Sequence, residues 1–253
     1  MHVSRLGLTP LKGARHLARR SVLLDAAGPA GDRAFCLVDP VAARCLRTVE
    51  HPALLGTEAE WDGERLVTRL PGGLVVEGEP APTGERLVVD YWGRPAAVEP
   101  VAGPWAAAYA RLLGRDVVLA RCAPGVVVFD APVSLVTRSS LAALSRAVGA
   151  AVDPARFRAT LVVDDGPGAA PDVDQAWAGR RLHVGAAELR VLGPVDRCAV
   201  VEVDPVSGRR DLSLLRALAA RGRSDHPLAL GVDAEVLRPG RVRVGDPVAL
   251  PEG

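Results

Sequence analysis

The stretch Asp196-Arg197-Cys198-Ala199-Val200-Val201-Glu202-Val203-Asp204-Pro205-Val206-Ser207-Gly208 is the most informative part of this chain. Cys198 has no partner thiol nearby, follows an arginine, and leads an apolar run of β type that ends in a turn. A lone thiolate beside a guanidinium is typical of a molybdenum or copper centre, or of a cysteine nucleophile. The alternative is core packing, because free cysteine is among the most frequently buried residue types.

The size and charge of the chain limit the classes of protein to which it can belong. It has 253 residues, enough for one large or two small domains, and 49% of them are hydrophobic, which is ordinary for a soluble globular protein. The formal net charge is +1, so the bulk charge favours neither nucleic acid nor an anionic membrane as a partner. Lys12 is the only lysine among 31 basic residues and therefore deserves more weight than any single arginine.

The sequence predicts a cytoplasmic protein. No apolar segment at the N-terminus resembles a secretory signal, and no apolar run reaches the ~18–20 residues that a membrane span needs. The cysteines are Cys36, Cys45, Cys122 and Cys198, and their spacing matches no zinc, redox or iron–sulfur pattern. We therefore expect four reduced thiols and no iron–sulfur cluster.

Short β-type runs bounded by Gly, Pro and Asp dominate the chain. They cover residues 3–8, 20–25, 34–38, 66–69, 74–76, 87–89, 96–100, 117–121, 133–136, 160–163, 181–184, 187–193, 199–203, 231–237 and 242–250. Three helices are predicted at 104–113, 137–148 and 211–221, the second capped by Thr137 or Ser139 and the third by Asp211. The pattern indicates a mainly β protein, a β-rich α+β class, in which closed barrels protect the many strand edges.

Several short stretches besides Cys198 could bind an anion. Lys12 follows a strand, Arg33 stands in Gly31-Asp32-Arg33-Ala34-Phe35, and Arg156-Phe157-Arg158 precedes another strand. Arginines, one lysine and hydroxyls such as those of Thr137 and Ser140 suit a phosphate-bearing ligand. Taken singly, Lys12 could equally be a solvated turn lysine. The Arg33 stretch is more typical of a structural turn, and Arg156-Phe157-Arg158 of an exposed basic edge.

Other site types find little support. There is no P-loop and no Rossmann fingerprint, and no two of the five histidines have metal-ligand spacing. A Cys–His hydrolase would have to recruit the distant His183 or His226.

Taken in order, these stretches resemble the MOSC superfamily, named for the molybdenum cofactor sulfurase C-terminal domain. The likeness is strongest to the mitochondrial amidoxime-reducing component and its bacterial relatives. The motifs that carry it are the Lys12 stretch, Gly31–Phe35, Phe129-Asp130 with Thr137 and Ser139-Ser140-Leu141, Arg156-Phe157-Arg158, Arg197-Cys198 with Val203-Asp204-Pro205, and Gly240–Val248. The resemblance implies an N-terminal MOSC β-barrel-like domain at 1–122 and a MOSC β-barrel domain at 123–253.

The resemblance also implies a cofactor site. Cys198 would be the catalytic residue and the protein ligand of molybdenum, and a pterin dithiolene would complete the metal's coordination. The expected cofactor-binding residues are Lys12, Arg33, Asp130, Thr137, Ser140, Arg158, Thr160 and Arg197. Because Arg197 and Cys198 would point to opposite faces of a regular strand, both can reach the cofactor only if Cys198 lies at the end of a strand or in a bulge.

By resemblance, the chain is an oxidoreductase that reduces small N-hydroxylated substrates. Its electrons would come from a separate reductase, since the cysteines cannot hold a cluster. Pyridoxal phosphate is not expected, because we assign the only lysine, Lys12, to the pterin. Nucleic acid and membranes are not expected as partners.

Two other interpretations remain open. One is a non-catalytic carrier of the molybdenum cofactor or of its sulfur. The other is a barrel whose cofactor site has decayed, since the chain departs from the family pattern at Gly13, Ala159 and Thr160, where serine, proline and asparagine are usual.

Overall fold

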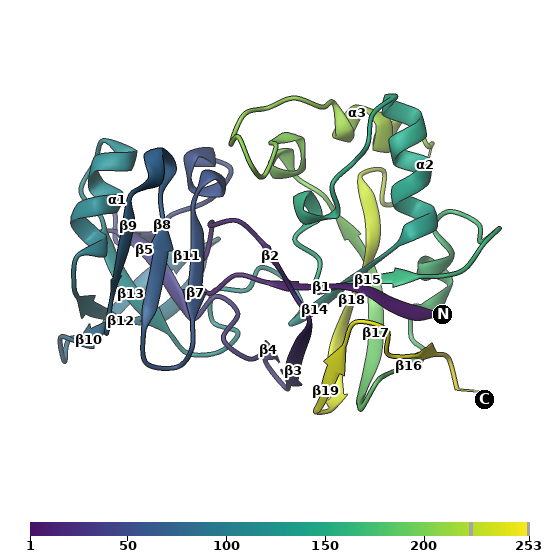
Figure 1. Cartoon of the computed structure of the whole chain (residues 1–253), viewed down its shortest axis with the longest axis horizontal. Helices are drawn as coiled ribbons and strands as arrows, with labels where there is room; N and C mark the ends of the chain where they lie inside the picture. The colour runs from purple at the N-terminus through teal and green to yellow at the C-terminus, as the bar shows by residue number, and fades with distance from the viewer. Residues whose placement is uncertain (223–224, 252–253) are drawn as a thin grey trace.

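The computed structural model describes residues 1–222 and 225–251. Two β-rich lobes lie side by side, one built mainly from the first half of the chain and the other mainly from the second half (Figure 1). The predicted mainly β class with a few helices is confirmed. Residues 223–224 and the last two residues of the expected second domain lie outside the described part.

The N-terminal lobe contains a closed barrel of five strands. These are β5 (Phe35–Asp39), β6 (Arg44–Cys45), β11 (Leu87–Tyr91), β12 (Arg94–Ala102) and β13 (Val118–Cys122). The pairing order is β12-β11-β6-β5-β13, and β13 pairs back onto β12, so these strands leave no open edge among themselves. The short strand β10 (Ala81–Pro82) adds to β12.

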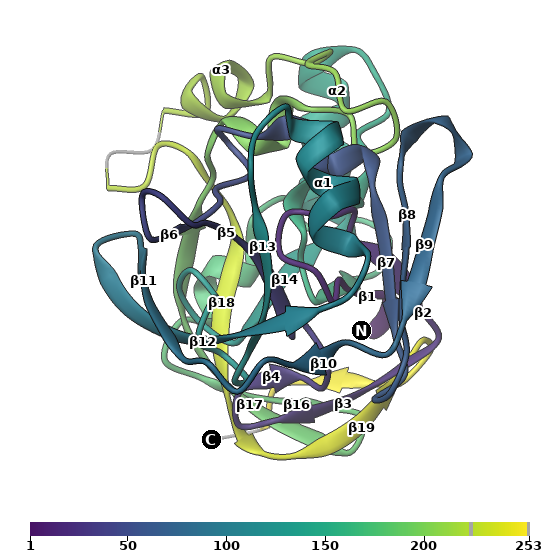
Figure 2. The same cartoon turned by 90° about the vertical axis from the view of Figure 1, so that its left-hand side faces the viewer.

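Strand β5 separates two layers of this lobe, because successive side chains of a strand point to opposite faces. Cys36 and Val38 belong to the cluster inside the barrel, whereas Phe35 and Leu37 pack in a second cluster with Trp105. That second cluster lies under helix α1 (Trp105–Leu113) and the sheet of β7 (Glu58–Trp61), β8 (Leu66–Arg69) and β9 (Val75–Gly78). Figure 2 shows α1 on the outer side of this lobe, in front of β13.

The C-terminal lobe is an eight-stranded sheet and a small three-stranded sheet around one core. In order the large sheet contains β2 (Leu17–Arg19), β1 (His2–Leu8), β15 (Leu161–Asp164), β14 (Val133–Thr137), β18 (Ala229–Arg238), β17 (Ala187–Asp196), β16 (Arg181–Val184) and β20 (Val248–Ala249). The small one contains β19 (Gly240–Arg243), β3 (Ser21–Asp25) and β4 (Gly28–Pro29). Both sheets contribute side chains to a shared hydrophobic cluster, which gives this lobe a barrel-like interior.

The first strands of the chain belong to the second lobe. Strand β1 pairs with β15, and β3 pairs with β19. Sheet pairing therefore joins roughly the first 29 residues to the second half of the chain, whereas the expected division puts them in domain 1–122. The division at residues 122 and 123 remains a proposal.

Two of the three helices lie where the sequence predicts them. Helix α1 begins after Pro104, and α2 (Arg138–Val148) is capped by Thr137, whose hydroxyl accepts a hydrogen bond from the Ser140 amide. Helices α2 and α3 (Leu214–Ala219) lie together over one end of the large sheet (Figure 1).

Three predicted elements differ from the structure. The run at 242–250 is not one strand: β19 ends at Arg243 and pairs with β3, and β20 (Val248–Ala249) pairs with β16. The third helix is shorter than the expected 211–221, and Asp211 does not cap it, because its carboxylate pairs with Arg156 instead. Residues 199–203 form no strand but the 3-10 helix η5 (Ala199–Glu202), since β17 ends before them. The other 3-10 helices are η1 (Pro52–Gly56), η2 (Pro71–Gly73), η3 (Pro154–Phe157) and η4 (Val173–Trp177).

Candidate functional site

A cavity of about 230 Å³ brings together most of the residues singled out in the sequence. The predicted residues on its wall are Lys12, Arg33, Asp130, Arg158, Thr160, Arg197 and Cys198. They come from both lobes and are far apart in the sequence, so only the tertiary fold assembles them. Thr137 and Ser140 are absent from the lining.

Cys198 lies just beyond the end of β17. It has extended backbone angles, φ −110° and ψ 175°, and its thiol is exposed immediately before η5. This position satisfies the geometric condition stated above, and Arg197 and Cys198 both line the cavity. The other three cysteines are also free, but they are buried in the barrel of the N-terminal lobe.

Arg197 fixes the position of Cys198. Its buried guanidinium donates from Nε to the carbonyl of Leu230 at 2.8 Å and from Nη1 to the carbonyl of Phe157 at 3.1 Å. These contacts tie the segment after β17 to β18 and to η3. Burial lowers the pKa of Arg197 to about 10, so it remains charged at neutral pH. Because several of its N–H groups already donate to backbone carbonyls, Arg197 has a positioning role besides any contact with a ligand.

Three further cations face the cavity with few partners. Lys12 has its Nζ 4.9 Å from the centre of the Tyr91 ring, Arg158 donates to the Ala14 carbonyl at 2.7 Å, and Arg33 pairs with Asp32. Burial, together with Arg33 and Arg158 nearby, lowers the pKa of Lys12 to about 8. Burial, with Arg33 next, likewise lowers the pKa of Arg158 to about 10. Among the described residues, Lys12 and Arg158 form no ion pair with a carboxylate, and Arg33 pairs only with Asp32. Cations held this close form a binding site for an anion.

Backbone strain is concentrated at the same cavity. Five non-glycine residues in the described part have positive φ, and three of them line it: Arg33 at 49°, Trp92 at 56° and Arg158 at 53°. A positive φ is uncommon for residues with a Cβ atom, and such strain clusters at functional sites. The surrounding fold holds these side chains where free peptides would rarely place them.

Three predicted hydroxyl residues have local partners. Thr137 caps α2, its Oγ1 lies 2.7 Å from the Ser140 hydroxyl, and Ser140 accepts from the Asp172 amide at 2.8 Å. Both side chains are fully buried, so the expectation that they bind the cofactor is not supported by their placement. Thr160 does line the cavity, and its hydroxyl also accepts from the Ser134 amide at 3.4 Å.

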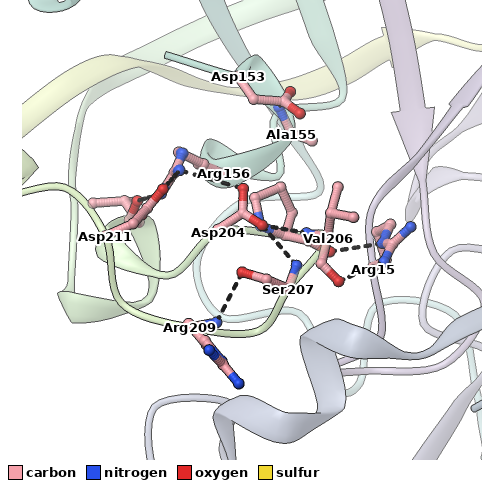
Figure 3. A network of polar contacts seen from close by, with 11 residues as sticks. Arg15, Asp153, Ala155, Arg156, Asp204, Val206, Ser207, Arg209 and Asp211 are labelled. Atoms are coloured by element: carbon pink, nitrogen blue, oxygen red, sulfur yellow. Dashed lines mark hydrogen bonds and ion pairs between the residues drawn. The ribbon is translucent and has the colours of Figure 1, made fainter. Parts of the chain in front are cut away.

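A polar network fixes the loop that follows η5 (Figure 3). Arg156 donates to both carboxylate oxygens of Asp211, at 2.8 and 2.5 Å, and approaches Asp204 at 3.5 Å. From the other side, Arg15 donates to the carbonyls of Pro205 at 2.6 Å and Val206 at 3.0 Å. The loop downstream of Cys198 is therefore held by Arg156, which lines the cavity, and by Arg15 from the segment between β1 and β2.

Sequence reasoning missed Asp233 and Trp92 on the cavity wall, whereas Phe129 stands in one of the motifs that carry the resemblance. Asp233 lies on β18 and is 7% exposed, whereas the aromatic rings of Trp92 and Phe129 are 40% and 61% exposed. The two rings meet edge to face at 5.3 Å, and Arg47 lies 4.3 Å above Trp92. Nothing in the sequence pattern places these side chains beside Cys198, although an aromatic residue before a glycine in a two-residue hairpin is unusual.

Within residues 1–222 and 225–251, no three histidine, cysteine or acidic side chains are grouped to hold a metal ion. Cys198 would thus be a single protein ligand, and any metal here must bring its other ligands with it. The exposed thiol and the adjoining cations fit a metal that arrives already bound by a sulfur-containing, phosphate-bearing organic group.

The fold and the site together define a β-rich, two-lobed protein with an exposed cysteine at the edge of a cationic cavity. Residues 107–249 match the MOSC domain model, and the chain belongs to the MOSC domain family, as predicted. This family is associated with molybdenum cofactor binding.

Three known proteins are similar to this chain. The chain is 28% identical over 222 residues to a molybdenum cofactor sulfurase of Caenorhabditis elegans, covering 83% of this chain and 30% of that protein. It therefore spans less than a third of the length of this relative. Among solved structures, the YuaD protein of Bacillus subtilis is similar with a TM-score of 0.47 and 14% identity, covering 97% of this chain and 92% of that one. YiiM of Geobacillus stearothermophilus is similar with a TM-score of 0.35 and 15% identity, covering 48% and 55%.

Within the described part of the chain, none of the helices is both long and apolar enough to cross a membrane.

Proposed function

We propose that the cavity binds the molybdenum cofactor, with Cys198 as the metal's protein ligand. The observation that carries this is the grouping of an exposed thiol with four buried or partly buried cations on one cavity wall. Lys12, Arg33 and Arg158 would hold the phosphate of the pterin, because in the described part of the chain only Arg33 among them pairs with a carboxylate, that of Asp32. Arg197 would keep the Cys198 segment in place.

We further propose that the loaded protein reduces small N-hydroxylated compounds. The bound cofactor would supply the two-electron redox chemistry, and a separate reductase protein would deliver the electrons. The chain's own residues would bind the cofactor, orient it toward the open side of the cavity, and present an apolar wall to the substrate. Trp92 and Phe129 form that wall at the cavity mouth.

Metal and pterin analysis tests the cofactor proposal. The protein is purified from a host that makes molybdenum cofactor, beside Cys198→Ala and the matched control Cys122→Ala, whose thiol lies in the N-terminal barrel outside the cavity. We expect about one molybdenum per chain in the wild type and in Cys122→Ala, and loss of the metal in Cys198→Ala. Full molybdenum in Cys198→Ala, or none in the wild type, would refute the assignment.

A non-catalytic carrier of the cofactor or of its sulfur is the second candidate. The sulfurase relative favours it, since this chain matches less than a third of that protein. Turnover of benzamidoxime with an artificial electron donor separates the two functions. Molybdenum-loaded protein that reduces benzamidoxime is an enzyme of the proposed type, and loaded protein without turnover supports the carrier.

A further inference from the structure

Asp233 is a buried carboxyl group with an unsatisfied oxygen on the cavity wall. It lies on β18, opposite Ser134 of β14 and Gly193 of β17, and its side chain is 7% exposed. Its Oδ2 has no hydrogen-bond partner in the protein. A buried polar atom without a partner is costly, and in native proteins such an atom calls for an explanation.

The burial of Asp233 favours its protonated form. Burial is the main cause that raises the pKa of this carboxyl to about 7, and the nearby negative charge of Asp130 acts in the same direction. Arg197 and the backbone amide of Ala131 oppose this shift. With a pKa of about 7, a substantial fraction of the molecules carries a protonated Asp233 at neutral pH, inside the same cavity as Cys198.

Reduction of an N-hydroxylated compound consumes protons as well as electrons. The N–O bond breaks, two electrons arrive from the separate reductase, and two protons convert the products to the amine or amidine and water. Because the cavity is partly shielded from bulk water, a proton donor beside the substrate would lower the barrier for loss of the oxygen as water. An arginine is too weak an acid for this step, and Lys12 is assigned to the phosphate.

We propose that Asp233 donates the proton that goes to the leaving oxygen of the substrate, and that Asp130 passes protons from solvent to it. Both residues line the cavity, and Asp233 is buried whereas Asp130 is exposed, so Asp130 can take up protons from water and Asp233 can present one inside the cavity. After donation, Asp233 is reprotonated through Asp130, and the second proton follows the same route. This inference rests on the proposed reductase function.

The first test measures the proton itself in the unloaded protein. Infrared difference spectra between about pH 5.5 and 8.5 record the carbonyl band of a protonated carboxylic acid. We expect a band that titrates near pH 7, disappears in Asp233→Asn, and shifts to lower pH in Asp130→Asn. The spectroscopic control is Asp196→Asn, whose exposed carboxylate lies on the same wall and bonds to His226 at 3.0 Å. That variant should retain the band.

The second test uses the molybdenum-loaded protein and benzamidoxime. Wild-type kcat should fall as the pH rises through about 7, and Asp233→Asn should lose at least tenfold in kcat and lose that pH dependence, with its molybdenum content unchanged. Turnover within twofold of wild type with the same pH profile overturns the proposal, and so does an infrared titration that survives in Asp233→Asn. Loaded wild type that titrates as expected but does not turn over refutes the reductase function instead, and the donor role falls with it.

Discussion

Replacement of Lys12 by methionine should make the unloaded protein more stable at neutral pH. The lysine ammonium lies partly buried beside Arg33 and Arg158, and its pKa is lowered from 10.5 to about 8, mainly by burial. Burial and the two arginines disfavour the charged form of Lys12, so this lysine does not contribute to the stability of the fold. Methionine keeps the apolar stem of the side chain and removes the charge.

The size of the effect follows from the pKa. A fall from 10.5 to about 8 corresponds to at most roughly 3 kcal/mol, at about 1.36 kcal/mol for each pH unit. Because water reaches the partly exposed side chain and the ring of Tyr91 attracts the ammonium, we expect about 1–2 kcal/mol. The unfolded chain binds more protons than the folded one between about pH 8 and 10.5, so the wild type gains stability as the pH rises through this window. The advantage of Lys12→Met is therefore largest below about pH 8 and disappears by about pH 10.5.

Urea unfolding of the unloaded protein at about pH 7 and pH 10 measures the free energy of unfolding. The control is Arg69→Met, which removes an exposed cation on β8 and should show no such change between the two pH values. In the protein loaded with cofactor, Lys12→Met should be unfavourable, because the variant retains less cofactor than the wild type. A Lys12→Met variant that is less stable than wild type at pH 7, or whose advantage does not change with pH, would contradict the reasoning.

Two further variants test strain and capping. Trp92→Asn should raise the free energy of unfolding by about 1 kcal/mol, because Trp92 has a φ of 56° at the first position of a two-residue hairpin turn before Gly93, where asparagine is favoured. Thermal unfolding measures this, and a loss of stability would mean that the contacts with Phe129 outweigh the strain. Thr137→Ala should cost about 1 kcal/mol through loss of the α2 cap while the molybdenum content stays unchanged, and loss of metal at unchanged stability would restore the expected cofactor contact.

Local patterns predicted the parts of the fold that depend on local sequence. Thr137 caps the second helix as expected, because a cap depends only on the first turn of its own helix. The pairing of β1 with β15 could not be predicted, since it joins residues about 160 positions apart. For the same reason Asp233 was missed, because only the sheet brings β18 beside the end of β17.

The structure also explains one departure from the family pattern. Gly13 stands where serine is usual, and it has a φ of 94°. A Cβ atom there would lie 2.8 Å from Cδ1 of Leu54. Glycine therefore suits both the backbone and the neighbouring side chain, and the change need not signal a decayed site. The sequence alone could not distinguish a sterically required glycine from a decayed site, because the steric conflict comes from Leu54 in η1, about 40 positions further along the chain.

The features that destabilise the folded protein, buried cations and strained backbone, are concentrated at the cavity, where a bound ligand could offset them. Lys12 and Arg158 carry lowered pKa values, and Arg33, Trp92 and Arg158 have strained backbones, all on one wall. None of these features helps the empty protein to fold. A ligand that binds only the folded state adds stability by mass action, about 4 kcal/mol at a thousandfold excess over its dissociation constant. An anion that neutralises these cations would recover the cost, so the arrangement is better explained by selection for binding than by selection for stability.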